Sequence, residues 1–117
     1  MRGTAMLVVA IVSWTPALAG EPRDMVDAKG AWTEYGIAIS LVAAAQVSEM
    51  RCGKKDWISA AITKVGQMGI KIDVNDKYDY ASIVGQASDI LSKAQSTGIT
   101  RWCATTTEKI GSLIGAR

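Results

Sequence analysis

The sequence predicts an all-α protein, a small four-helix domain stapled by one disulfide. Four segments carry apolar residues at the three- and four-residue spacing of an amphipathic helix. Beyond residue 19 the chain has a single proline, Pro22, so no helix breaker interrupts these segments. The two cysteines of the chain, Cys52 and Cys103, lie on either side of the two middle segments.

Residues 1–19 have the organisation of a secretory signal peptide. Arg2 supplies the positive charge, residues 5–12 form the apolar core, and residues 17–19, Ala-Leu-Ala, form a small-x-small cleavage site. The apolar core is too short to serve as a stable membrane anchor. We therefore expect a single helical domain over residues 20–117, exported to the periplasm or the extracellular medium. The alternative is that the first residues form a buried helix of the mature fold.

The first helix of the domain is predicted over residues 31–50. Its apolar residues fall on two faces, with Trp32, Tyr35, Ile39 and Val42 on one and Ile37 and Leu41 on the other. A helix that is apolar on nearly all sides is normally central. We expect the other three helices to surround it, and the alternative is that a second subunit or a client protein covers part of it.

A second, shorter helix is predicted over residues 56–68. Its apolar positions are Trp57, Ile58, Ala61, Ile62, Val65 and Met68. Gly66 and Gly69 are expected to limit its end. Residues 70–74 alternate with the period of a strand, but no second alternating run exists to pair with them. We expect this segment to be an extended connector.

The third helix is predicted over residues 79–96, and Gly98 is placed to end it. Its apolar stripe comprises Tyr80, Ile83, Val84, Ala87, Ile90, Leu91 and Ala94. Asn75 or Asp76 is expected to cap its first turn, because their side-chain oxygens can accept hydrogen bonds from the first backbone N–H groups. Asp79 in that turn is expected to complement the helix dipole.

A fourth helix is predicted over residues 100–113, with Trp102, Cys103, Thr106, Ile110 and Leu113 on one face. The first and fourth helices each carry a ridge of small residues four positions apart: Gly36, Ser40, Ala44, Ser48 and Cys52 on the first, and Cys103, Thr107, Gly111 and Gly115 on the fourth. If Cys52 and Cys103 are bonded, these helices can run antiparallel with their ridges in contact. Leucine at Ala44 or Gly111 would then overpack the contact and destabilise the fold.

The surroundings of Cys52 allow two interpretations, a reactive thiolate and half of a disulfide. Arg51, Lys54 and Lys55 lie close to it in sequence, and nearby positive charge makes a thiol a better nucleophile. However, the chain contains no histidine that could serve as its base. An even number of cysteines in an exported chain normally means pairing, so we predict a Cys52–Cys103 disulfide.

The composition excludes several kinds of chemistry. The absence of histidine excludes serine–histidine and cysteine–histidine hydrolases and histidine-ligated zinc or haem. Removing Arg2 from the 13 basic residues leaves 12 against 11 acidic residues, interleaved along the chain, which argues against nucleic-acid binding. Residues 73–79 look like the start of a calcium loop, but Lys77 and Tyr78 stand where a ligand and a glycine are required. We therefore predict no metal and no cofactor.

The favoured functional interpretation is a protein that acts without catalysis by binding another protein, as an inhibitor, an immunity factor or an accessory subunit. A second copy of the chain, forming a homodimer, is one candidate partner. Aromatic residues are enriched at interfaces, so the candidate contact residues are Trp32, Tyr35, Tyr78 and Tyr80. For each of them, packing in the core or at a helix end is the alternative.

Two other functions are kept as alternatives. An exported helical chain with Cys52 and Cys103 on either side of its middle helices is similar to the HdeA/HdeB family of periplasmic acid-stress chaperones, over about residues 50–117. This resemblance implies partial unfolding in acid and protection of other proteins. The remaining alternative is a small carboxylate-dependent secreted enzyme, whose candidate acids are Asp73, Asp76 and Asp79.

Overall fold

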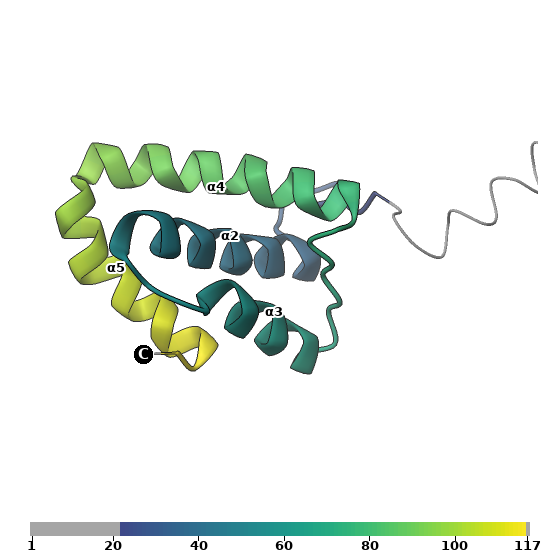
Figure 1. Cartoon of the computed structure of the whole chain (residues 1–117). Coiled ribbons are helices and arrows are strands. Elements are labelled where there is room, and N and C mark those ends of the chain that lie inside the picture. Colours follow the sequence, from purple (N-terminus) through teal and green to yellow (C-terminus); the bar gives the residue numbers. More distant parts are fainter. Residues whose placement is uncertain (1–21, 117) are drawn as a thin grey trace, which may run out of the picture.

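Figure 1 shows the fold in a computed structural model of the chain, which describes residues 22–116. Within this range the chain forms four α-helices and no strand: α2 (Glu34–Cys52), α3 (Trp57–Gln67), α4 (Lys77–Thr97) and α5 (Ile99–Ile114). The Cys52–Cys103 disulfide is present, with the two Cα atoms 5.5 Å apart. The predicted all-α, disulfide-stapled class is therefore confirmed. The predicted signal peptide, residues 1–19, lies outside the described residues.

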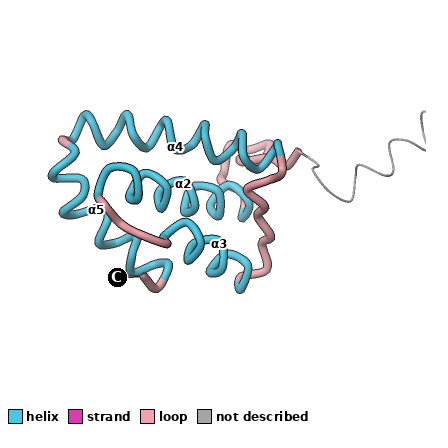
Figure 2. Tube along the Cα trace, in the orientation of Figure 1, coloured by secondary structure: helices cyan, strands magenta, loops and turns pink. Residues whose placement is uncertain are grey.

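α2 is the central helix. It packs against each of the other three helices, and α3 and α4 lie on opposite sides of it (Figures 1 and 2). α2 and α4 run in the same direction, whereas α3 runs in the opposite direction (Figure 1). Ten of the 19 residues of α2 are buried, as expected for a core helix, but Ile37 on its second apolar face is 54% exposed, so the other helices do not cover α2 on every side. No helix in the described part of the chain is both long and apolar enough to cross a membrane.

α2 begins three residues later than the sequence predicted, because Thr33 caps it. The Thr33 hydroxyl accepts a hydrogen bond from Gly36 N–H at 2.9 Å, and the Thr33 N–H donates to the Met25 carbonyl. Trp32 forms an isolated β-bridge with Val26 and is not part of the helix. The segment before α2 is thus folded back against its first turn.

α3 begins at an unusual junction. Asp56 precedes it with a φ of 64°, in the left-handed region, and its side chain caps nothing. Glu49 of α2 supplies the missing cap, because its Oε2 atom accepts a hydrogen bond from Ile58 N–H at 2.8 Å. After α3, residues 70–74 form a connector without strand pairing, as predicted, and Ile72 anchors it in the core.

α4 and α5 extend one or two residues beyond their predicted ends. Asp76 is the cap of α4, since its carboxylate accepts hydrogen bonds from the N–H groups of Tyr78 and Asp79. Gly98, with a φ of 104°, both ends α4 and begins α5. The apolar stripes predicted for these two helices are wider than their buried faces, since Tyr80 and Val84 of α4 and Leu113 of α5 are exposed. Each of these helices is covered along one side only.

The small ridges of α2 and α5 meet beside the disulfide, as predicted. There the Thr107 hydroxyl lies 3.3 Å from Sγ of Cys52. Farther along α5, Gly111 faces α3: a Cβ atom placed on it would lie 2.9 Å from Cη2 of Trp57. The ridges diverge because α5 crosses the end of α2 obliquely (Figure 1).

Candidate functional site

An apolar groove lies between the central helix and α4. It has a volume of about 220 Å³. α2 contributes Gln46, Val47, Met50 and Arg51, and α4 contributes Val84, Ala87, Ser88 and Leu91. The lining is therefore apolar except for Gln46, Ser88 and Arg51. Such a surface can bind a ligand mainly by excluding water from apolar groups.

The exposure of the groove residues sets them apart from the core. Met50 is 58% exposed and Val84 is 41% exposed, whereas Val47 between them is fully buried. Val84 and Leu91 are seven residues apart on α4, so they lie two helical turns and about 10 Å apart along the same side. The groove is thus a hydrophobic strip in which Val47 belongs to the core, while Met50 and Val84 are open to solvent.

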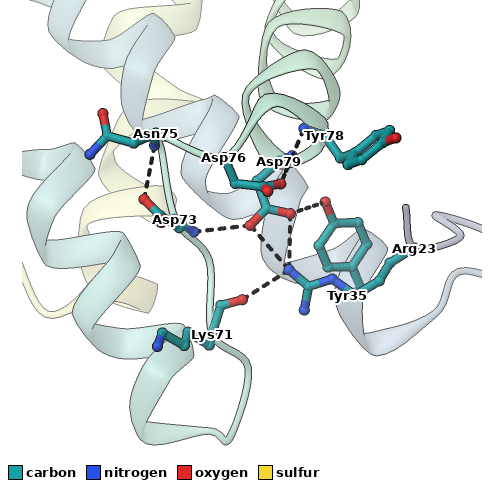
Figure 3. Close-up of polar contacts among 8 residues, drawn as sticks. All are labelled: Arg23, Tyr35, Lys71, Asp73, Asn75, Asp76, Tyr78 and Asp79. Atoms are coloured by element: carbon teal, nitrogen blue, oxygen red, sulfur yellow. Dashed lines mark hydrogen bonds and ion pairs between the residues drawn. The ribbon is translucent and has the colours of Figure 1, made fainter. Parts of the chain in front are cut away.

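A buried polar cluster lies at the opposite end of α2, where Asp79 of α4 is the central group (Figure 3). Arg23 Nη2 donates to both carboxylate oxygens of Asp79, at 2.9 and 3.1 Å. The Tyr35 hydroxyl donates to Oδ1 at 2.7 Å, and the backbone N–H of Asp73 donates to Oδ2 at 3.0 Å. Arg23 also lies over the Tyr35 ring, with its guanidinium carbon 4.1 Å from the ring centroid. The cluster ties the segment before α2 to α2, the 68–76 connector and α4.

The two acidic groups of this cluster have shifted pKa values. Burial acts to raise the pKa of Asp79, but the hydrogen bonds from Asp73, Tyr35 and Arg23 outweigh it, so the pKa lies below its ordinary value of 3.8. Burial, together with the hydrogen bond to Asp79, raises the pKa of Tyr35 above 10.0. Asp79 is therefore an ionised, fully hydrogen-bonded carboxylate, whose role here is structural.

The other candidate acids are also engaged in local structure. Asp73 Oδ1 accepts a hydrogen bond from Asn75 N–H at 2.9 Å, and Asp76 caps α4 (Figure 3). Between residues 22 and 116, no group of three cysteine or acidic side chains is placed to hold a metal ion. Asp73, Asp76 and Asp79 thus do not converge on a shared open site.

The four predicted contact residues have different positions in the structure. Trp32, Tyr78 and Tyr80 are exposed, with Tyr80 58% exposed on α4 one turn before Val84. Tyr35 is only 7% exposed, with its hydroxyl bonded to Asp79, so its assignment as a surface contact residue is corrected. It belongs to the core because α4 and Arg23 cover the face of α2 that carries it.

Sequence reasoning missed the groove residues as a surface. The sequence pattern places Val84 and Leu91 in the apolar stripe of the third helix and Met50 at the end of the first, and it predicts no shared surface for them. One signal was present: the apolar stripe of residues 80–94 covers a wider arc than a single neighbouring helix can bury.

A second hollow, of about 570 Å³, follows α5 next to Trp57. Its walls contain the small ridge of α5, including Thr107, Gly111 and Gly115. Lys54 and Glu108 bring opposite charges to it, and Lys54 Nζ lies 5.3 Å from the centroid of the Trp57 ring. This hollow is mixed in character, so the groove between α2 and α4 is the stronger candidate for an apolar contact.

Comparison with models of protein families, with curated proteins and with solved structures found no match to this chain, so its function is argued from its own geometry.

Proposed function

We propose that this protein acts without catalysis by binding another protein, and that the groove between α2 and α4 is its contact surface. The observation that carries this proposal is the exposure of Met50 and Val84 beside Leu91 in one continuous apolar strip. Complete burial of a side chain of this size contributes about 1.5–3 kcal/mol, and these side chains are already partly buried. We therefore expect the burial of each of these side chains by a partner to contribute about 1 kcal/mol to the binding free energy.

Three further features support a protein partner. The strip lies on two packed helices and is therefore largely preformed, which lowers the entropy lost on binding. Met50 is flexible and polarisable, and methionine adapts well to the shape of a bound partner. Tyr80 extends the strip on α4 with an exposed aromatic ring of the kind enriched at interfaces.

The proposal includes the compartment. A disulfide between Cys52 and Cys103 is stable in oxidising surroundings and rare in the cytosol. Residues 1–19 carry the expected export signal, so the partner is sought in the periplasm or the extracellular medium. A second copy of the chain in that compartment is one of the possible partners.

The test is capture of partners from the envelope and secreted fractions by the oxidised chain of residues 20–117. Val84→Glu should abolish capture, because it places a charge in the middle of the strip. Ser92→Glu adds the same charge to an exposed position of α4 outside the groove and should capture as the unmodified chain does. Circular dichroism would confirm that both variants fold. Equal capture by Val84→Glu and the unmodified chain would refute the proposal.

Repeating the capture experiment after acidification distinguishes a specific binding protein from an acid-stress chaperone. One dominant partner at neutral pH would support the binding function, whereas many partners captured only in acid would support an acid-stress chaperone. Sedimentation of the chain alone shows whether the partner is a second copy.

A further inference from the structure

The corner around the disulfide carries an excess of positive charge. Four basic side chains lie within three residues of Cys52 or Cys103 in the sequence: Arg51, Lys54, Lys55 and Arg101. Because the two half-cystine Cα atoms are 5.5 Å apart, these side chains share one end of the molecule. From the sequence alone, Arg51, Lys54 and Lys55 are expected to form a solvated corner next to the disulfide, with an anion site as the alternative.

None of these four cations forms an ion pair between residues 22 and 116. Two acids lie in the same stretch of sequence: Asp56, which directly follows Lys55, and Glu49, which caps α3 through its bond to Ile58 N–H. The ion pair found between residues 22 and 116 joins Arg23 to Asp79, at the other end of α2. The C-terminal end of the α2 dipole offsets only about half a charge. Four cations stand against three acids, Glu49, Asp56 and Glu108, the last of which lies with Lys54 in the hollow along α5, so the corner carries a small excess of positive charge.

This charge adjoins the apolar groove. Arg51 is itself a lining residue. Because α2 and α4 run in the same direction, Arg51 and Leu91 lie toward one end of the groove and Gln46 and Val84 toward the other. A bound segment would thus meet aliphatic side chains along its length and a cation at one end.

We propose that the groove binds an amphipathic helical segment of another protein, with carboxylate side chains at the end that reaches Arg51. This inference rests on the proposed function and specifies its partner. A strip two helical turns long suits a helix that presents apolar anchors at positions i, i+3, i+4 and i+7. Charge complementarity at the rim adds partner choice and association rate more than affinity.

The test uses three synthetic 14-residue peptides with the same leucine face and with two Glu, two Gln or two Lys residues at one end. Binding to the oxidised chain is followed by NMR of the Met50 and Val84 amides at low and high salt. We expect the Glu peptide to bind about five-fold more tightly than the Gln peptide, and the Lys peptide to bind most weakly. High salt should reduce these differences.

Variants of the chain complete the test. Arg51→Glu should reverse the order of the peptides, and Arg51→Gln should remove the preference. Lys64→Glu makes the same charge change in the last turn of α3, away from the groove, and should leave the order unchanged.

Two results would overturn the inference in different ways. Equal affinity for all three peptides, with binding lost in Val84→Glu, would refute the acidic partner and leave the proposed function in place. Binding to phosphatidylglycerol vesicles without binding to any peptide would assign the cations to a lipid surface. The proposed function is tested separately by the capture experiment, and it fails if Val84→Glu captures partners as well as the unmodified chain does.

Discussion

Single residues at the two ends of α2 have opposite roles. At its beginning, Tyr35 and Asp79 are buried and hydrogen-bonded to each other and to Arg23. At its end, Met50 and Arg51 are exposed and have no such partners among the described residues. The beginning of α2 is therefore held by polar contacts, while Met50 and Arg51 near its end leave their side chains in solvent. Residues that make many specific bonds fix the fold, and residues that make few are free to contact a partner.

Asp79→Asn tests the polar cluster. An amide keeps the shape of the side chain but removes the charge and one acceptor, so the hydrogen bonds from Arg23, Tyr35 and Asp73 cannot all be kept. We expect the free energy of unfolding, measured with urea, to fall by about 2 kcal/mol. Asp89→Asn, an exposed position on the same helix, should change it by less than about 0.5 kcal/mol. Equal effects of the two variants would mean that the cluster contributes nothing specific.

Gly111→Leu tests the contact between α5 and α3. Gly111 leaves no room for a side chain, because Trp57 would lie 2.9 Å from an added Cβ atom. We expect a loss of about 1–3 kcal/mol in urea unfolding. The matched control is Gly85→Leu in α4, where an added Cβ meets nothing within 4 Å. A Gly111→Leu variant as stable as the control would show that α5 can move away from Trp57 at little cost.

At the scale of elements, the beginnings of helices depend on side chains from different places. Thr33 and Asp76 cap α2 and α4 from the position just before each helix, which is where sequence reasoning looks for caps. α3 takes its cap from Glu49, on another helix. A cap of this kind couples two elements, because α3 can begin at Trp57 only when the last turn of α2 is formed nearby.

Glu49→Ala should therefore weaken α3 in particular. Removal of a capping side chain costs about 1 kcal/mol. We expect this loss in urea unfolding, together with faster amide hydrogen exchange in the first turn of α3. Glu108→Ala, which removes an exposed acid on α5, is the control. If exchange increased equally in all four helices, the loss would be global and the local cap would have no special role.

At the scale of the whole molecule, two long-range links close the fold. The disulfide joins the end of α2 to α5 across 51 residues, and a loop of that length corresponds to about 4 kcal/mol in the chain-entropy description. The Arg23–Asp79 pair joins the segment before α2 to α4 across 56 residues. The first link does not depend on pH in the acid range, whereas the second does.

The pH dependence of stability follows from the lowered pKa of Asp79. A carboxylate whose pKa is lower in the folded state stabilises the fold above its unfolded value, here about 3.8, and loses this contribution as the pH falls through the folded pKa. The difference in unfolding free energy between the unmodified chain and Asp79→Asn should be constant from pH 8 to pH 5. It should shrink below pH 3.8. A difference that already declines between pH 7 and pH 5 would contradict the lowered pKa.

The number, type and approximate limits of the helices between residues 22 and 116, and the pairing of the cysteines, are predictable from the amino-acid sequence. These features depend on local spacing and on simple counts, such as the apolar period of residues 79–96 and the presence of only two cysteines. Asp76 is one of the two caps predicted for α4, and this prediction was possible because a cap and its helix are neighbours in the chain.

Which of the apolar residues are buried depends instead on how the helices pack against one another. Ile83 and Val84 are adjacent in one predicted stripe, yet Ile83 faces α2 and is buried while Val84 stands at the groove. Arg23 and Asp79 are likewise 56 residues apart, and nothing in either local sequence pairs them. Burial and ion pairing depend on where neighbouring helices lie, and the periodicity of one helix does not contain that information.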